Sequence, residues 1–329
     1  MDAVKPILQI ENLQTHFFTK AGVVKAVDGV SFDINAGEVV GLVGESGSGK
    51  SITGFSVMGL VDAPGRIVGG RIMFKGADIA AMSPQELQSL RGNRISMIFQ
   101  DPMMTLNPVL RVETQMVEAI KAHDSTISKS EARVRARDAL GLVGISAPEE
   151  RMRAYPHQFS GGMRQRVSIA IAMLNRPDLI IADEPTTALD VTIQGQVIHE
   201  MQRLCEVTKT ALLWITHDLA VVAGIADRIC VLYAGRVVEQ GPIASTISQP
   251  LHPYTRGLMG SVPSQNRRGQ PLQQIDGMVP SLLSLPVGCA FQNRCSMVSD
   301  KCLSETPGPT DVGGKRLVRC VNVGQEQAS

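Results

Sequence analysis

Eight consecutive residues near the start of the chain have the types and spacing needed to hold phosphate groups. They match the pattern G-x-x-x-x-G-K-[ST] and read Gly44-Glu45-Ser46-Gly47-Ser48-Gly49-Lys50-Ser51. The glycines let backbone N–H groups turn toward phosphate oxygens, and the start of a following helix adds its dipole. We expect Lys50 to reach the β- and γ-phosphates of a nucleotide and the Ser51 hydroxyl to hold Mg²⁺. The sequence therefore predicts a phosphate-binding loop, called the phosphate loop below.

Two adjacent carboxylates, Asp183 and Glu184, follow the apolar run Leu179-Ile180-Ile181-Ala182. In proteins with such a phosphate loop, the aspartate at the end of a strand holds Mg²⁺, so Asp183 is the expected ligand. A second carboxylate beside it can act as a base that polarises a water molecule. We therefore expect Glu184 to serve that role in hydrolysis.

The segments that must position these residues alternate between predicted strands and helices. Continuous apolar runs at 39–43, 179–182, 211–215 and 229–232 are typical of buried parallel strands, and helical segments lie between them. Within the first 40 residues, 7–13 and 30–34 are β-rich runs with a turn signal at Lys20-Ala21-Gly22. This alternation predicts an α/β fold with a largely parallel sheet.

Two further regions differ from this alternating core. Capping boxes begin at Ser83 and Ser128, and Ala136, Leu140 and Val143 line one helical face, so residues 101–160 are interpreted as a helical insertion. After about residue 250 the composition shifts to Pro, Gly, Gln and Ser. We expect a nucleotide-binding domain over 1–250 and a loop-rich extension over 251–329.

The overall composition limits the class of protein. A net charge of +1 over 329 residues gives no electrostatic footprint of a nucleic-acid-binding protein. The chain has no run of 18 apolar residues, so it is not expected to span a membrane, and Met1 to Gln14 has no signal-peptide pattern.

The segment just before the strand that ends in Asp183 and Glu184 identifies a family. It reads Ser160-Gly161-Gly162-Met163-Arg164-Gln165-Arg166 and resembles the signature loop of ATP-binding-cassette (ABC) ATPases, usually Leu-Ser-Gly-Gly-Gln. Ser160 would cap a helix that starts near Gly162, and the glycines would offer N–H groups to a phosphate. In that family the loop meets the nucleotide held by a second ATPase subunit.

Other matches follow in the family's order. Gln100 resembles the Q-loop glutamine, which touches Mg²⁺ and the attacking water, and Ala188-Leu189-Asp190 resembles the D-loop. His217 resembles the switch histidine that contacts the γ-phosphate. Phe17 or Phe18 falls where the family places an aromatic ring on adenine. The resemblance implies a RecA-like core with an antiparallel β subdomain and a helical subdomain, which bind ATP and Mg²⁺.

Longer segments resemble the dipeptide, oligopeptide and nickel importers. They are Gln100-Asp101-Pro102, Leu106-Asn107-Pro108, Tyr155-Pro156-His157-Gln158, Asp190-Val191-Thr192 and His252-Pro253-Tyr254-Thr255. The resemblance implies a partner ATPase subunit that is commonly a different chain, two membrane permeases and a separate substrate-binding protein. It also implies a peripheral location on the cytoplasmic face of the inner membrane. The transported solute is selected by the permeases and the substrate-binding protein, which are other chains.

The cysteines are unevenly distributed. Cys205 and Cys230 lie in apolar segments and are expected to pack as small hydrophobic residues. Four others form the series Cys289-x5-Cys295-x6-Cys302-x17-Cys320, which is similar to the tail of the same subfamily. Few large apolar side chains lie nearby, so we expect a metal to fix this tail in place of a core. Four thiolates suit an iron–sulfur cluster or zinc, and the resemblance favours a four-iron four-sulfur cluster.

The sequence thus predicts the ATP-hydrolysing subunit of an ABC importer for peptides or a related small solute. One alternative is a soluble cassette ATPase that acts on nucleic acid. A second is a metal- or redox-sensing ATPase, which the four tail cysteines permit.

Overall fold

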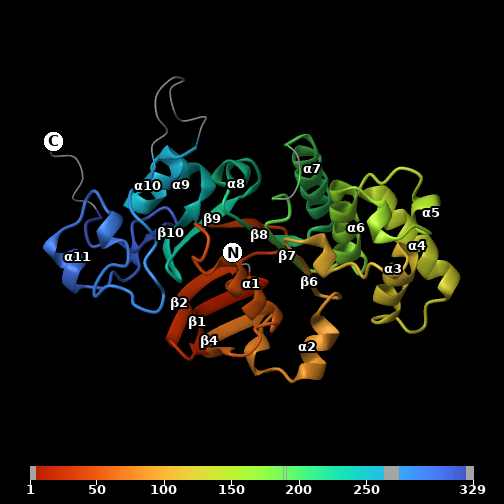
Figure 1. Ribbon diagram of the computed structural model, residues 1–329, viewed down its shortest axis with the longest axis horizontal. Coiled ribbons are helices and arrows are strands. Elements are labelled where there is room, and N and C mark those ends of the chain that lie inside the picture. Colours follow the sequence, from red (N-terminus) through yellow and green to blue (C-terminus); the bar gives the residue numbers. More distant parts are fainter. Residues whose placement is uncertain (1–4, 188, 190, 263–273, 324–329) are drawn as a thin grey trace. The chain divides into compact units, whose positions relative to one another are not determined.

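The computed structural model describes residues 5–187, 189, 191–262 and 274–323, and the chain divides into two compact units. The phosphate-loop unit comprises residues 8–34, 39–80 and 215–329. The helical unit comprises residues 1–7, 35–38 and 81–214. Figure 1 shows the elements of both units, coloured along the sequence. Among the described residues, no helix combines the length and apolar character needed to cross a membrane.

An antiparallel sheet forms the first layer of the phosphate-loop unit, with the strand order β2-β1-β4-β5. Its strands are β1 (Leu8–Thr19), β2 (Gly22–Ile34), β4 (Gly65–Phe74) and β5 (Ala77–Asp78). The predicted pair of strands around the turn at Lys20 is confirmed, and both strands are longer than predicted. They are longer because β1 pairs with β2 along its whole length, from Leu8 opposite Ile34 to Thr19 opposite Gly22.

A second sheet in this unit has the strand order β11-β12-β10-β9-β3. Its strands are β3 (Val39–Val43), β9 (Arg228–Tyr233), β10 (Arg236–Pro242), β11 (Thr310–Asp311) and β12 (Leu317–Val318). The strands β3 and β9 are parallel, as their continuous apolar runs predict. The helices of the unit are α1 (Lys50–Met58), α8 (Leu219–Ile225), α9 (Ile243–Ser248), α10 (Pro253–Gly260) and α11 (Asp300–Ser304), with the 3₁₀ turn η5 (Gln292–Arg294).

The helical unit contains strands in the order β8-β7-β6, flanked by most of the longer helices (Figure 1). The strands are β6 (Ile95–Ile98), β7 (Leu179–Asp183) and β8 (Ala211–Thr216), and every residue in them is buried. The helices are α2 (Pro84–Leu90), α3 (Val112–Lys121), α4 (Lys129–Leu142), α5 (Pro148–Arg151), α6 (Gly161–Met173) and α7 (Val191–Thr208). Its short 3₁₀ turns are η2 (Pro102–Met104) and η3 (Pro156–Gln158), and η1 (Ile79–Ala81) falls where the chain passes from one unit to the other.

Local sequence signals explain where these helices begin. Ser83 and Ser128 each form the predicted capping box, with Glu86 and Glu131 respectively. The face of α4 predicted to be apolar is buried, including Ala136 and Leu140. Residues 101–160 do contain several helices, while the bounds of the predicted insertion and of the two predicted domains stay predictions.

The extension is loop-rich, as predicted, and residues 274–291 contain neither helix nor strand. Few large apolar side chains of residues 274–323 are buried, and Phe291 is one of them. Tyr254 and Phe291 are buried and pack with Tyr233 of β9, at centroid distances of 4.6 to 5.5 Å within this trio. Such tilted and edge-on contacts are favourable arrangements for aromatic rings. The extension therefore packs on β9 through an aromatic cluster.

Candidate active site

The phosphate loop connects β3 to α1, as the motif requires. Two of its glycines cannot be replaced without displacing backbone. A Cβ on Gly44 would lie 2.2 Å from the Leu232 carbonyl oxygen, and one on Gly49 would lie 2.3 Å from that of Ala26. Gly49 also has a φ of +105° and caps α1 without any side-chain hydrogen bond. The first N–H groups of α1 are therefore left without a side-chain cap, which suits an anion-binding helix start.

Lys50 lies inside the curve of this loop. Its side chain is only 5% exposed, and its Nζ donates hydrogen bonds to the carbonyl oxygens of Gly44 at 2.7 Å and Glu45 at 2.9 Å. The ammonium group is thus held in the loop by the loop's own backbone. A fixed cation in a glycine-rich loop matches the charge of a bound phosphate.

The aromatic residue expected to stack on adenine lies on β1 of the same unit. Phe17 packs against Gly65, where an added Cβ would lie 2.6 Å from its ring. Phe18 is 40% exposed, and the Arg66 guanidinium lies 4.2 Å from its ring centroid. The two rings have different surroundings, and the stacking of one of them on adenine stays a prediction.

His217 also belongs to the phosphate-loop unit and lies between β8 and α8. Its neighbour Asp218 caps α8 by accepting hydrogen bonds from the N–H groups of Ala220 and Val221. The Asp218 N–H donates to Thr216 Oγ1 over 3.0 Å. These contacts fix the strand-to-helix turn on which His217 is exposed.

In the helical unit, Gln100 and Glu184 come together at one edge of the parallel strands. Ile98 of β6 pairs with Ala182 of β7, so the residues two positions further on also emerge side by side. Gln100 Nε2 donates to Glu184 Oε2 at 3.2 Å, and Thr187 Oγ1 donates to the same oxygen at 3.0 Å. The Glu184 carboxylate is therefore oriented by two donors.

The backbone at Glu184 adopts a left-handed conformation, with a φ of +45°. This region is sparsely populated by residues other than glycine, asparagine and aspartate, and such residues cluster at functional sites. Asp183, the preceding residue, ends β7 and is only 4% exposed. A buried carboxylate at this point has the hard oxygen chemistry that Mg²⁺ prefers.

The signature segment begins α6, and Ser160 caps that helix as predicted. Ser160 Oγ accepts a hydrogen bond from the Met163 N–H over 3.3 Å. Gly162 lies against α7, where a Cβ would approach Ile193 Cγ2 to 2.7 Å. Ser160 and Gly161 are both exposed, so this helix start is open to a further molecule. Ala188 and Asp190 of the predicted D-loop lie outside the described residues.

The predicted residues thus fall into two groups, one in each unit. The phosphate-loop unit holds the phosphate loop, Phe17 and His217. The helical unit holds Gln100, Asp183, Glu184 and the signature segment. Within the phosphate-loop unit the loop backbone holds Lys50, and within the helical unit Gln100 contacts Glu184.

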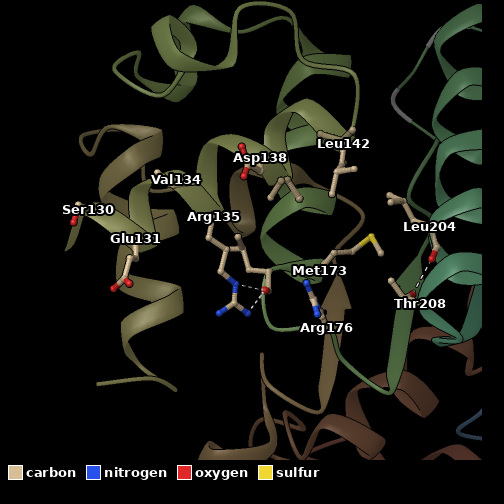
Figure 2. Close-up of a pocket in the computed structure, with 14 residues that line it drawn as sticks. Ser130, Glu131, Val134, Arg135, Asp138, Leu142, Met173, Arg176, Leu204 and Thr208 are labelled. Carbon is tan, nitrogen blue, oxygen red and sulfur yellow. Dashed lines mark hydrogen bonds between the residues drawn. The ribbon is translucent and has the colours of Figure 1, made fainter. Parts of the chain in front are cut away.

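A separate cavity of about 870 Å³ lies in the helical unit. Figure 2 shows residues of α4, the end of α6 and the end of α7 around it, among them Leu142, Met173 and Leu204. None of the residues predicted for the active site lines this cavity. It is therefore not part of the candidate active site.

The cysteines of the extension are all free thiols. Cys302 is buried, and burial raises the pKa of Cys289 to about 11, with smaller contributions from Cys302, Cys295 and Cys320. The Met297 N–H donates to Cys295 Sγ over 3.4 Å. Across the described part of the chain, however, no three His, Cys, Asp or Glu side chains are grouped closely enough to hold a metal. The predicted metal centre is not supported by this geometry. Cys205 and Cys230 are buried, as predicted.

Comparison with known proteins decides the family. Residues 27–187 match the family described as ABC transporter, and residues 238–302 match the one described as oligopeptide/dipeptide transporter, C-terminal region. The chain is 48% identical to the oligopeptide transport ATP-binding protein AppD of Bacillus subtilis (strain 168), with 98% of each chain covered. The chain belongs to the ABC transporter family. Like other ABC ATP-binding proteins of importers, it is an ATPase.

Further similarities support this ABC assignment. The dipeptide transport ATP-binding protein DppD of Escherichia coli (strain K12) is 45% identical, covering 95% of this chain and 96% of that protein. Among solved structures, the dimeric post-hydrolysis form of the ATP-binding cassette MJ0796, bound to ADP and Pi, matches with a TM-score of 0.65. That match has 27% identity and covers 72% of this chain and 98% of the other. The predicted cassette fold is confirmed, and the nucleic-acid and sensor alternatives are not favoured.

One feature of the site was missed in the sequence. Glu45 places a carboxylate in a loop built for phosphates, and the structure pairs it with Arg294. The signal available was the acidic residue itself, because a negative charge beside bound phosphate calls for a neutralising partner.

Proposed function

We propose that this chain supplies ATP hydrolysis to an importer of di- or oligopeptides, or of a related small solute. The substrate class is proposed because the chain is 45 to 48% identical, over almost its whole length, to dipeptide and oligopeptide transport ATP-binding proteins. The extension adds to this, because its match is to the C-terminal region of peptide transporters.

In the proposed mechanism, the phosphate loop binds the triphosphate of ATP. Backbone N–H groups of the loop and the start of α1 contact phosphate oxygens, and the Lys50 ammonium neutralises their charge. Ser51 and Asp183 offer a hydroxyl and a carboxylate oxygen to Mg²⁺, which when bound stabilises the phosphate charge. Gln100 is proposed to contribute a further oxygen ligand. Phe17 is proposed to stack on the adenine, with Phe18 as the other candidate.

Glu184 acts as the base in this proposal. Its carboxylate accepts a proton from the attacking water while Gln100 holds that carboxylate in place through the hydrogen bond at 3.2 Å. His217 supports the γ-phosphate from the strand-to-helix turn. The contribution of the protein is mainly positioning and charge stabilisation, as in other phosphoryl transfers.

We propose that the complete site is shared between two ATPase subunits. Ser160, Gly161 and Gly162 would contact the nucleotide held by a partner, and Asp190 would lie at the same junction. The exposed start of α6, capped by Ser160, is the observation that favours this. The partner is proposed to be a second, non-identical ATPase, and two permeases would hold the pair at the cytoplasmic face of the inner membrane. A substrate-binding protein would act indirectly through the permeases.

Co-purification and transport assays test the importer proposal. The tagged chain is expected to bring down two permeases and a second ATPase from detergent-solubilised membranes. Vesicles that contain the complex are expected to take up a labelled peptide only with ATP and the binding protein. Recovery of the chain without permeases, in a preparation where the permeases are intact, would contradict the proposal.

We further propose that Cys289, Cys295, Cys302 and Cys320 bind one metal centre, a four-iron four-sulfur cluster or zinc. In support of this, Cys302, Cys295 and Cys320 each contribute to the raised pKa of Cys289, although burial is its main cause. Backbone N–H groups two residues along also donate to Cys289, Cys295 and Cys320, as sulfur-bound metal sites often require. Anaerobic purification with iron, sulfide and zinc analysis tests this. Absence of both metals would contradict it.

A further inference from the structure

The phosphate loop is connected to the extension by an ion pair between Glu45 and Arg294, an arginine outside the nucleotide-binding motifs described above. Arg294 Nη1 donates to Glu45 Oε2 at 2.7 Å, and Arg294 Nη2 donates to Glu45 Oε1 at 3.0 Å. The two parallel contacts form the fork geometry that arginine makes with carboxylates. We call this pair the Glu45–Arg294 clamp.

Arg294 is itself held rigidly on the side of the extension. Its side chain is 5% exposed, and its Nε donates to the Asp276 carbonyl oxygen at 3.0 Å. The guanidinium carbon lies 5.8 Å from the ring centroid of Tyr233 and 5.9 Å from that of Phe291. An arginine fixed by backbone and aromatic rings loses little further freedom when it binds a carboxylate.

A second contact from the extension reaches the backbone of the same residue. The Glu45 N–H donates to the Tyr254 hydroxyl over 2.9 Å, and Tyr254 is fully buried. Glu45 is therefore held through both its side chain and its main chain. The Glu45 carbonyl oxygen in turn accepts a hydrogen bond from Lys50 Nζ. Glu45 therefore connects the clamp to the cation of the loop.

The charge of Glu45 makes this arrangement relevant to ATP binding. A carboxylate in the phosphate loop repels the triphosphate, and the repulsion is strong where burial lowers the local dielectric. The Arg294 guanidinium cancels that charge at hydrogen-bonding distance. Without it, the loop would carry a negative charge beside the phosphates.

We propose that Arg294 is a positioning residue for ATP binding, through which the C-terminal extension holds the phosphate loop and neutralises Glu45. This inference rests on the proposed role of the phosphate loop. Arg294 precedes Cys295 directly, so any change in the fold of the cysteine segment acts on the residue that holds the loop. The extension is thereby part of the ATP site and sets its affinity.

Binding of Mg²⁺–ATP to the full-length chain, measured by calorimetry, tests this. Arg294→Met is expected to weaken ATP binding by about tenfold, because it removes a charge-assisted fork and exposes the phosphates to Glu45. The double variant Glu45→Gln with Arg294→Met removes the unpaired carboxylate and is expected to recover affinity to within about threefold of the unmodified chain. A merely structural role for Arg294 predicts no such recovery, so a double variant as weak as Arg294→Met would overturn the proposal.

A matched control comes from another buried arginine–glutamate pair in the same unit. Arg316 Nη2 donates to Glu239 Oε1 at 2.6 Å and joins the extension to β10 without touching the phosphate loop. Arg316→Met is expected to lower the stability of the chain, while the ATP affinity of the folded protein stays within about twofold because Glu239 lies outside the phosphate loop. An equal loss of affinity in Arg316→Met and Arg294→Met would overturn the specific role of the clamp.

Two further variants separate the possible failures. Arg294→Lys keeps the charge but loses the fork geometry, and it replaces Arg294→Met if that variant does not fold. We expect it to bind ATP about threefold more weakly. Unchanged ATP affinity would contradict the role of Arg294 in positioning the loop. Lys50→Ala tests the loop itself. If Lys50→Ala weakens ATP binding while Arg294→Met leaves it within twofold, the clamp proposal alone fails. If Lys50→Ala has no effect on ATP binding, the proposed role of the phosphate loop fails together with the clamp proposal.

In the assembled transporter, Arg294→Met is expected to raise KM for ATP while kcat at saturating ATP changes little.

Discussion

Gln100 and Glu184 are joined by a hydrogen bond across the ends of two neighbouring parallel strands, with 3.2 Å between Nε2 and Oε2. Gln100 follows β6 and Glu184 follows β7, and the pairing of Ile98 with Ala182 brings both to the same edge. The amide therefore orients the carboxylate proposed to activate water. Changes at this pair should affect hydrolysis more than nucleotide binding.

The first prediction concerns Glu184→Gln in the assembled transporter. Glutamine preserves the shape of the side chain but cannot accept a proton, so ATP turnover is expected to fall by about a hundredfold or more. ATP affinity is expected to stay within about threefold, because the phosphate contacts are unchanged. Single-turnover ATP hydrolysis and calorimetry measure the two quantities.

The control for this prediction is Thr187→Val, which removes only the second donor to Glu184 Oε2. Loss of one hydrogen bond to an ionised carboxylate, of about 1.5–3 kcal/mol, is expected to lower turnover less than the loss of the carboxylate itself in Glu184→Gln. Turnover near that of the unmodified complex in Glu184→Gln would remove Glu184 from the role of base.

The second prediction is that Lys50→Ala lowers ATP affinity. The buried ammonium is held in the loop by the carbonyl oxygens of Gly44 and Glu45, and its loss leaves the phosphates without that cation. Calorimetry is expected to show at least about tenfold weaker binding, as for the loss of a strong charge-assisted contact. The control is Lys121→Ala at the exposed end of α3, which removes the same charge outside the site. Equal affinities in both variants would contradict the assignment.

The third prediction follows from the exposed start of α6. In the composite site, Ser160→Ala is expected to slow hydrolysis of the ATP bound by the partner ATPase, while ATP binding by this chain is unchanged. Loss of the cap also costs about 1 kcal/mol of stability. Ser128→Ala is the matched control, because it removes another serine cap in the same unit and costs a similar amount.

ATPase assays of the purified chain and of the assembled transporter distinguish the outcomes. The chain alone at high dilution is expected to hydrolyse ATP poorly, and activity is expected to rise as the partner ATPase and permeases are titrated in. Full activity in the dilute chain would contradict a shared site. A loss in Ser128→Ala as large as that in Ser160→Ala would show that only helix stability was affected.

The phosphate loop, the carboxylates and the signature segment were predictable because each is a short continuous motif. Their local structure follows from neighbouring residues, as when Ser160 caps α6 or an apolar run forms β7. The Glu45–Arg294 clamp joins residues separated by 249 positions, and nothing near either residue indicates the other. The aromatic packing of Tyr254 and Phe291 on Tyr233 was missed for the same reason. Contacts between distant segments depend on the tertiary fold, which short motifs do not encode.

The fourth prediction concerns acid stability and His252. Burial lowers the pKa of His252 from 6.5 to about 3, while its hydrogen bond to the Arg319 backbone opposes this shift. Its Nδ1 accepts the Tyr254 N–H at 3.0 Å, so the neutral ring caps α10. Between pH 6.5 and about 3, the unfolded chain binds a proton at this residue that the folded chain does not. Stability is therefore expected to fall as pH decreases through this window, by about 1.4 kcal/mol per pH unit.

Urea denaturation of the full chain over this pH range measures the effect. His252→Asn provides the control, because asparagine can cap the helix but does not titrate, and part of the pH dependence should disappear. An identical slope in the variant and the unmodified chain would show that other groups cause the acid sensitivity.

Glu239 limits where the chain can be divided into separate parts. It lies on β10 with no exposed surface, and its carboxylate accepts hydrogen bonds from Arg316 and from the N–H groups of Leu251 and His252. A chain truncated near residue 250 would lose these donors and leave an anion in the interior, at a cost of about 3–5 kcal/mol. We therefore expect that the protein cannot be cut near residue 250, although its composition changes there. A cassette from another transporter exchanged for residues 1–250 would remove Glu239 itself and take this carboxylate away from Arg316 of the extension, unless it carried an acidic residue at the same position.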